Sequence, residues 1–249
     1  MSGRKARLLT TRLGELDCFV VDALPEGATP ELAVVLCHGF GATASDLVSW
    51  APELMSLEAS LAGSVRFVFP GAPLTLESLG MPDGRSWFEL PEDLMRRHLR
   101  DWDRYAREVP PGLPAARQAL MSVVDAVSTS MKLPHGRIVL GGFSQGGMVS
   151  TDVALRMEEA PAGLCILSGT LICEPEWRQK AQGRKGLPVF QGHGRYDDVL
   201  PFAAAERLRD LLTESGLEVD FHPFHGPHMI DADEAERMAA FLAARLGGR

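Results

Sequence analysis

Short apolar runs of strand length alternate with longer amphipathic stretches along most of this chain, and that order restricts the folds that it can adopt. Such alternation is typical of an α/β fold, in which helical crossovers connect parallel strands. Continuous apolar runs, such as AVVLC at 33–37, further indicate strands covered on both faces. The expected strands are 33–37, 65–69, 138–140, 163–167, 187–191 and 218–224. We therefore predict a central, mostly parallel sheet with helices on both faces.

The remaining segments are placed around these strands. Residues 7–24 are expected to form two strands that meet at a turn near Gly14, and residues 74–90 are expected to form a loop. The amphipathic stretches predict helices at 46–61, 92–108, 114–131, 146–159, 202–215 and 231–246. The chain has no internal repeat and no long linker, so we predict a single domain over residues 1–249.

Charge and hydropathy exclude several classes of function. The formal net charge is −8, and no cluster of Lys and Arg provides the basic surface that nucleic-acid binding requires. No apolar run approaches the roughly 20 residues that span a bilayer. The first residues are basic but lack the apolar stretch of a secretion signal. We therefore expect a cytoplasmic protein with no membrane span and no nucleic-acid partner.

The four cysteines, Cys18, Cys37, Cys165 and Cys173, do not form a CxxC or metal-type pattern. Three of them lie in or beside apolar strand-like runs, where a thiol behaves as a small buried side chain. His38, which stands beside glycines, has no partner at the spacing of metal ligands. We therefore expect reduced cysteines, no metal site and no cofactor.

A serine stands between two glycines at the point where an expected strand meets an expected helix. The segment GFSQG at 142–146 fits the pattern G-x-S-x-G, and it follows the apolar RIVL at 137–140. In this context the pattern indicates a nucleophile elbow, a tight turn that exposes the hydroxyl of Ser144 near a helix N-terminus. Side chains at 142 or 146 would collide with the neighbouring strand and helix. An ordinary glycine-rich loop is the alternative interpretation.

A serine hydroxyl is a weak nucleophile, so Ser144 requires a histidine base that a carboxylate orients. In this fold class, the acid and then the histidine follow the serine along the chain. Of the later histidines, His193 precedes the candidate acids, and His222 falls within an expected strand. His225 and His228 lie in the loop before the last helix, and spacing alone does not separate these two candidate bases.

The candidate acids are Asp197 and Asp198, in the loop that follows the strand at 187–191. Either carboxylate could accept the imidazole N–H. A structural interpretation exists for both, because Asp198 lies near the start of the next helix and Asp197 could stabilise a turn.

An oxyanion hole requires two backbone N–H groups. The first belongs to the residue after the nucleophile, here Gln145, and the second to a loop after an early strand. The segment CHGFG at 37–41 has the glycine-rich form expected of that loop, so Phe40 is the candidate for the second donor.

Together these motifs resemble the phospholipase/carboxylesterase family of small α/β-hydrolases, which includes acyl-protein thioesterases and bacterial carboxylesterases. The matching segments are LCHGFGAT (36–43), FPGAP (69–73), RSWFEL (85–90), RIVLGGFSQGGMVS (137–150), LSG (167–169), QGHGRYDDVLP (191–201) and GPHMI (226–230). They follow the family's order from about residue 31 to the last helix. The resemblance implies an α/β-hydrolase fold. It also implies that Ser144 is the nucleophile, Asp197 the acid and His228 the base, with oxyanion donors at Phe40 and Gln145.

Three further points follow from the resemblance. Trp87, within RSWFEL, matches an aromatic residue that lines the acyl or alcohol pocket in relatives, although a purely core tryptophan is the alternative. Asp198 stands where the family usually has proline, and Arg195 where relatives often have aspartate, which keeps Asp197 and Asp198 both open as the acid. The segment 92–112 is longer and more charged than its family counterpart, so we expect a cap-like insertion at about 74–112 that forms a small helical cap.

The chemistry expected of this set is hydrolysis of carboxylic esters or thioesters through an acyl-enzyme. The expected partner is a small-molecule ester or acyl substrate, and a homodimer is an open alternative to a monomer. Dienelactone-hydrolase-like or peptidase activity on the same scaffold is a second hypothesis, against which serine rather than cysteine at the elbow counts mildly. A non-catalytic binding protein is a third hypothesis, and it would require a damaged triad.

Overall fold

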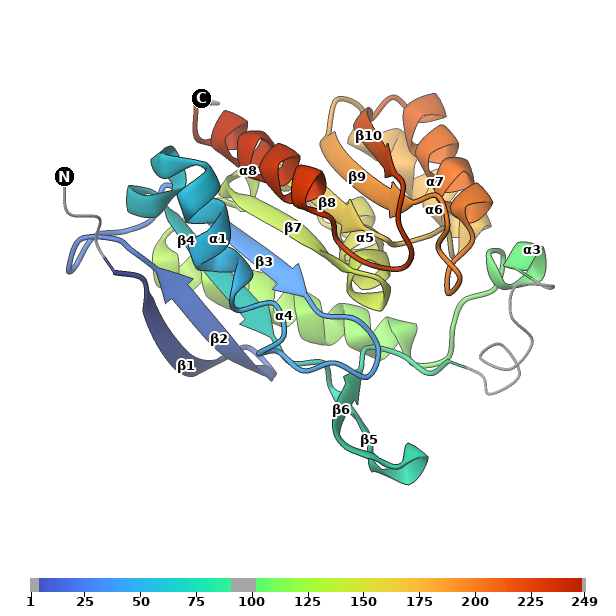
Figure 1. Ribbon diagram of the computed structural model, residues 1–249, viewed down its shortest axis with the longest axis horizontal. Helices are drawn as coiled ribbons and strands as arrows, with labels where there is room; N and C mark the ends of the chain where they lie inside the picture. The colour runs from blue at the N-terminus through green and yellow to red at the C-terminus, as the bar shows by residue number, and fades with distance from the viewer. Residues whose placement is uncertain (1–4, 91–101, 248–249) are drawn as a thin grey trace.

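The computed structural model describes residues 5–90 and 102–247 (Figure 1). Within these ranges, eight strands form one sheet in the order β1-β2-β4-β3-β7-β8-β9-β10. β2 pairs antiparallel with β1 and with β4, whereas the neighbours from β4 to β10 all pair parallel. The mostly parallel sheet is therefore confirmed. The strands are β1 (Arg7–Leu13), β2 (Leu16–Asp22), β3 (Leu32–Cys37), β4 (Val65–Pro70), β7 (Ile138–Phe143), β8 (Gly163–Leu167), β9 (Pro188–Gly194) and β10 (Glu218–Phe224).

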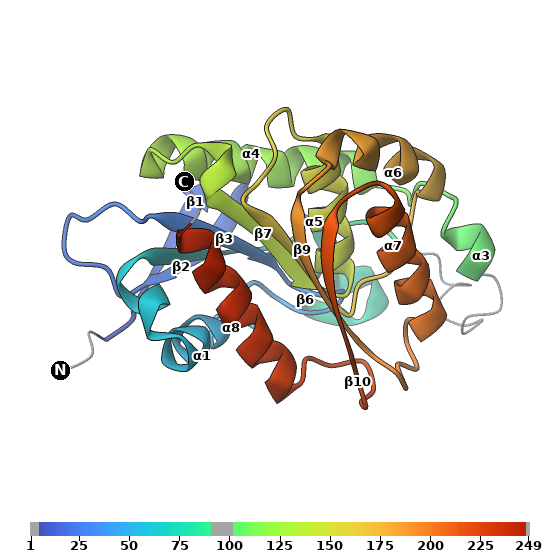
Figure 2. The same ribbon diagram turned by 90° about the horizontal axis from the view of Figure 1, so that it is seen from above.

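Helices cover both faces of the sheet, as Figure 2 shows, with α1 and α8 on one side and α4, α5 and α6 on the other. Each face has its own apolar core. In β3, Ala33 and Val35 belong to one core, while Val34 and Leu36 belong to the other, because successive strand residues point to opposite faces. The helices are α1 (Trp50–Leu57), α4 (Leu113–Met131), α5 (Gln145–Arg156), α6 (Glu174–Ala181), α7 (Phe202–Glu214) and α8 (Ala232–Leu246).

A buried carboxylate ties three of these helices together. Asp152 of α5 is fully buried, and its Oδ2 accepts a hydrogen bond from Arg117 Nε of α4 at 2.5 Å. Its Oδ1 accepts hydrogen bonds from Trp177 Nε1 of α6 at 2.8 Å and from Arg156 Nε at 3.0 Å. Removing one partner of such a buried ion pair typically costs about 3–5 kcal/mol. The cluster therefore holds α4, α5 and α6 together on one face of the sheet.

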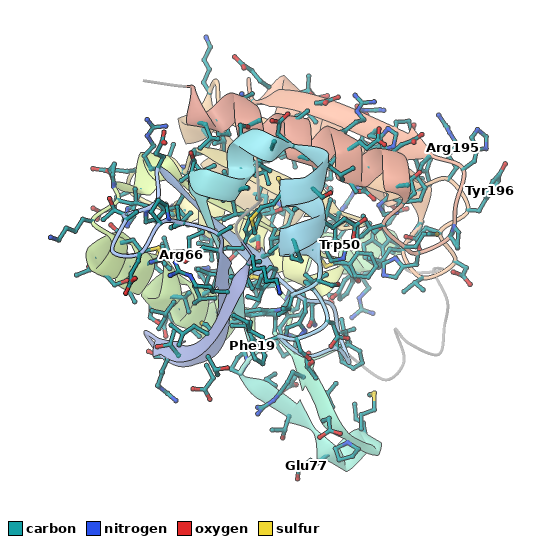
Figure 3. All side chains as sticks on the ribbon, turned by 60° about the vertical axis from the view of Figure 1, so that its left-hand side comes forward. Phe19, Trp50, Arg66, Glu77, Arg195 and Tyr196 are labelled. Carbon is teal, nitrogen blue, oxygen red and sulfur yellow. The ribbon has the colours of Figure 1, made fainter. Side chains whose placement is uncertain are left out.

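The segment expected to be a loop at 74–90 is instead largely a β-hairpin, so that expectation is wrong. β5 (Leu74–Leu76) pairs antiparallel with β6 (Met81–Ser86), and the hairpin extends from the body of the molecule (Figure 1). Figure 3 shows Glu77 at its far end. The sequence hides the pairing because β6 contains Pro82 and Gly84, which are rare in strands, and because the register shifts between Thr75 and Leu76.

Of the cap-like insertion expected at about 74–112, the structure describes this hairpin and the four-residue helix α3 (Trp102–Tyr105). Residues 91–101, which make up most of the helix expected at 92–108, lie outside the described residues.

Other differences are smaller. The helix α6 was not expected from the sequence, and β7 extends to Phe143 rather than ending at residue 140. The position of Gly141 within this strand requires a glycine, because a Cβ there would lie only 2.7 Å from the carbonyl oxygen of Cys165 in β8. In residues 5–90 and 102–247, no helix combines the length and the hydropathy needed to cross a bilayer.

Candidate active site

The segments that carry the candidate residues all follow the carboxyl ends of parallel strands. Residues 38–42 follow β3, Ser144 follows β7, Asp197 follows β9, and His228 follows β10. These ends meet at one edge of the sheet, where open α/β sheets place their binding sites. The topology thereby brings together residues that are far apart in the sequence.

Ser144 occupies the sharp turn between β7 and α5. Its φ of 54° and ψ of −119° are rare for a residue with a side chain, and such strain is concentrated at functional sites. The Ser144 N–H donates a hydrogen bond to the Leu167 carbonyl of β8 at 2.8 Å, which helps to hold the turn. This is the geometry of the nucleophile elbow expected from GFSQG.

The two glycines of that motif are required by close backbone packing. A Cβ on Gly142 would lie 2.3 Å from the carbonyl oxygen of Cys37, and a Cβ on Gly146 would lie 2.0 Å from the same atom. Both distances are far below van der Waals contact, so a side chain at either position would push α5 away from the end of β3. The steric interpretation of the motif is therefore confirmed.

The structure pairs His228 with Asp197. His228 Nδ1 lies 2.7 Å from Asp197 Oδ2, and the Asp197 side chain is fully buried. Because a carboxylate only accepts hydrogen bonds, Nδ1 carries the proton and Nε2 is left as the acceptor. His228 also packs against Phe143, with ring centroids 4.7 Å apart, and lines the same cavity as Ser144.

The alternatives for the base and the acid lie elsewhere. His225 is exposed and packs on Tyr196, which Figure 3 shows at the outer side of the loop after β9. Asp198 is exposed at the cavity wall, and among the described residues its carboxylate has no histidine partner. The geometry therefore favours His228 over His225 and Asp197 over Asp198.

Asp197 is held by more groups than the sequence suggested. Its Oδ1 accepts hydrogen bonds from the N–H groups of Val199 and Leu200, at 2.9 and 2.7 Å. His193, which chain order excluded as the base, is fully buried; its Nε2 donates to the Leu200 carbonyl at 3.0 Å and lies 3.2 Å from Asp197 Oδ2. The HG pair before the acid is the sequence signal that could have indicated this position.

These contacts decide the charge of the acid. Burial by itself would raise the pKa of Asp197, but His193, His228 and the N–H of Leu200 hold that pKa well below its ordinary value. Asp197 is therefore ionised near neutral pH, as a carboxylate that orients an imidazole must be.

The residues that carry the candidate oxyanion donors lie at the cavity beside Ser144. Phe40 and Gln145 both line that cavity. Within the described part of the chain, the N–H of Phe40 makes no hydrogen bond, and the N–H of Gln145, the first residue of α5, has no partner within its helix. A Cβ on Gly39 would lie 3.5 Å from Ser144 Cβ, so the 38–42 loop directly adjoins the elbow.

The cavity over Ser144 has a volume of about 390 Å³. Apolar and aromatic side chains make up much of its wall, among them those of Leu90, Trp102, Tyr105, Met148, Val199 and Leu200. A second cavity of about 310 Å³ adjoins the first at Gly39 and Phe143, which line both cavities. It includes Asp46 and Trp50, the latter labelled at the start of α1 in Figure 3.

Trp87 does not line either cavity, contrary to the expectation for RSWFEL. Its side chain is fully buried, and its indole N–H donates to the His38 carbonyl at 2.9 Å. The His38 carbonyl in the 38–42 loop gives the buried indole the hydrogen-bond partner that a tryptophan inside a protein usually has. Any effect of Trp87 on substrate is thus exerted through other residues.

No group of three or more His, Cys, Asp or Glu side chains suited to a metal ion occurs in residues 5–90 and 102–247. All four cysteines are buried and free, and burial raises the pKa of the thiols of Cys18 and Cys37 to about 12. The cysteines are therefore unreactive thiols of the core.

Comparison with known proteins places these observations in a family. The model of the family described as Phospholipase/Carboxylesterase matches residues 18–246. Acyl-protein thioesterase 1 of Mycosarcoma maydis is 30% identical over 231 residues, which cover 87% of this chain and 92% of that protein. Acyl-protein thioesterase 1 of Candida albicans is 26% identical over 226 residues, covering 87% and 93% of the two chains.

Solved structures agree. The crystal structure of esterase PE8 superposes with a TM-score of 0.77 at 25% identity and covers 96% of this chain and 99% of that chain. The carboxylesterase of Mesorhizobium loti shares the fold, with a TM-score of 0.71 at 19% identity over 96% and 98% of the two chains.

Proposed function

The chain belongs to the phospholipase/carboxylesterase family of α/β-hydrolases, and we propose that it hydrolyses carboxylic esters and thioesters through an acyl-enzyme on Ser144. The resemblance, the α/β-hydrolase fold and the assignment as an ester hydrolase are confirmed by the family match. The individual residue roles and the substrate are the content of the proposal.

One observation carries the proposed mechanism: a strained Ser144 and the His228 that Asp197 holds line a single cavity, together with Phe40 and Gln145, whose N–H groups have no partner among the described residues. Ser144 Oγ attacks the acyl carbon, and His228 Nε2 takes its proton while Asp197 Oδ2 holds Nδ1–H. The N–H groups of Phe40 and Gln145 stabilise the tetrahedral oxyanion. The intermediate then expels the alcohol or thiol, to which His228 returns the proton, and water hydrolyses the acyl-enzyme by the same steps.

The residues that line the two cavities favour small acyl substrates with apolar groups. The larger cavity adjoins Ser144 with mostly aliphatic and aromatic side chains, which favour an acyl or alcohol chain without charge. The smaller cavity, which adjoins the larger one at Gly39 and Phe143, provides room for the second half of the ester. Thioesters are included because curated relatives are named acyl-protein thioesterases.

The same proposal covers the setting of the reaction. We propose that the chain works as one domain in the cytoplasm, on small-molecule acyl substrates. Analytical ultracentrifugation would decide between a monomer and a homodimer, which the proposed chemistry permits equally because the nucleophile, acid and base all come from one chain.

The purified protein should hydrolyse p-nitrophenyl esters of two to twelve carbons, and acyl thioesters with the same acyl groups. For an ester whose deacylation is slower than its acylation, stopped-flow absorbance should show a burst of about one p-nitrophenolate per protein, because the first turnover forms the acyl-enzyme. Folded protein that cleaves none of these substrates, and does not react with a fluorophosphonate, would overturn the proposed function.

A further inference from the structure

The segment 85–88, where β6 leaves the protruding hairpin, lies between the two halves of the candidate oxyanion hole. One half is the 38–42 loop with the N–H of Phe40, and the other is the start of α5 with the N–H of Gln145. Ser86, Trp87 and Phe88 are all buried. The segment is thus a buried connection between the 38–42 loop and the start of α5.

The segment is hydrogen bonded to the side chain of Gln145. The Trp87 backbone N–H donates to Gln145 Oε1 at 2.8 Å, and Gln145 Nε2 donates to the Phe88 carbonyl at 2.8 Å. The hydroxyl of Ser86 lies within 3.1 Å of the same Oε1. The Gln145 amide is fully buried and bonds this segment at both ends, so it fixes the residue whose backbone N–H is the first oxyanion donor.

The same segment is hydrogen bonded to the 38–42 loop. The Trp87 indole N–H donates to the His38 carbonyl at 2.9 Å, and the Trp87 and His38 rings lie 5.8 Å apart. At the outer end, the Gly41 N–H donates to the Arg85 carbonyl at 2.9 Å. Trp87 therefore makes hydrogen bonds to both the His38 carbonyl and the Gln145 side chain.

His38 transmits this contact to the second donor. Its Nε2 accepts the N–H of Ala72 at 3.0 Å, so the proton of the neutral ring is on Nδ1, which donates to the Gly39 carbonyl at 2.8 Å. Burial lowers the pKa of His38 and so preserves this neutral form. In a trans peptide the carbonyl and the following N–H point in opposite directions. Holding the Gly39 oxygen on the His38 side therefore directs the Phe40 N–H away from His38.

We propose that Trp87, His38 and the side chain of Gln145 form an oxyanion bridge, which fixes the spacing and direction of the Phe40 and Gln145 N–H groups. This inference rests on the proposed acyl-enzyme chemistry at Ser144. The groups of the bridge bond one another and the backbone rather than the reacting atoms. Its members therefore act as positioning residues for a preorganised pair of donors, which stabilise charge only where their geometry is held. In this proposal, the buried Trp87 contributes to the reaction by holding the two N–H donors in position.

The test is Trp87→Phe, which removes the indole N–H but keeps an aromatic ring. We expect kcat for a short p-nitrophenyl ester to fall about 10- to 100-fold while KM changes less than about twofold, because the donors act mainly in the transition state. The inhibition constant of a trifluoromethyl ketone, which forms a tetrahedral adduct with the serine, should rise by a similar factor. Gln145→Met, which breaks the other end of the bridge, should do the same.

Trp177→Phe is the matched control. It also removes a single buried indole hydrogen bond, from Trp177 Nε1 to Asp152 Oδ1, but in the cluster that joins α4, α5 and α6. We expect its loss of thermal stability to be similar and its kcat to stay within about twofold of the wild type. The double variant Trp87→Phe/Gln145→Met should lose little more kcat than either single variant, because both changes break one structure.

The proposal is wrong if folded Trp87→Phe keeps its kcat, if Trp177→Phe loses as much, or if the whole loss appears in KM. Should Trp87→Phe fail to fold, Gln145→Met decides by the same criteria. Absence of Ser144-dependent hydrolysis in the wild type would instead refute the proposed function, whereas an active wild type with an unaffected Trp87→Phe would refute only the bridge.

Discussion

His228→Ala is expected to lower kcat by about 10⁴–10⁶-fold, the loss typical of removing the base of a serine triad. The reason is chemical: without an imidazole, nothing takes the proton of the Ser144 hydroxyl or returns it to the leaving group. KM should change far less, because His228 forms only a small part of a largely apolar cavity wall. Steady-state kinetics on a p-nitrophenyl ester measure both quantities.

His225→Ala is the control within the same loop. His225 is exposed and lies against Tyr196, outside the cavity, so its removal should leave kcat within about twofold of the wild type. A silent His228→Ala together with an inactive His225→Ala would transfer the role of the base to His225 and refute the geometry described above.

Asp197→Asn should lower kcat by about 10⁴-fold near neutral pH, the effect known for this change in a serine triad. An amide at this position can donate a proton to His228 Nδ1, which would place the imidazole proton on Nε2 and leave it unable to accept from Ser144. The substitution also removes the negative charge that stabilises the imidazolium form of His228. Asp198→Asn, the matched change one residue away, should leave kcat nearly unchanged, and the opposite pattern would make Asp198 the acid.

The same substitution has a thermodynamic consequence with a definite sign. Because contacts in the folded protein lower the pKa of Asp197, its ionised form contributes stability at pH values above the unfolded value of about 4. That contribution is lost as pH falls from about 4 toward the lowered folded pKa. Thermal unfolding between pH 3 and 7 should therefore show a steeper acid loss of Tm for the wild type than for Asp197→Asn.

Sequence reasoning located the core of the fold and the chemical centre because both leave strong local patterns. Continuous apolar runs such as the one that became β3 report strands buried on both faces. The glycines around Ser144 report a turn that only glycine allows, and the structure gives the reason in the closeness of Cys37. Patterns of this kind depend on neighbours along the chain, so they can be recognised before any contact is known.

Features that depend on distant partners could not be recognised in this way. His193 contributes through a contact with Asp197 that chain order does not indicate. The resemblance predicts Trp87 at the cavity wall, but its indole bonds the buried His38 carbonyl, a distant partner that no local pattern indicates. The β5–β6 hairpin and α6 were missed because the first contains strand-breaking residues and the second buries only Trp177 and Ala181.

The central claim, that Ser144 carries the acyl group, is tested most directly by mapping covalent modification. An activated serine attacks the phosphorus of a fluorophosphonate and displaces fluoride, which leaves a covalent adduct on the serine. Intact-mass analysis of the wild type should therefore show one adduct, and peptide sequencing should place it on Ser144. Ser144→Ala should remain folded, take up no label and lose esterase activity. An adduct on any other residue, or equal labelling of Ser144→Ala, would contradict the account.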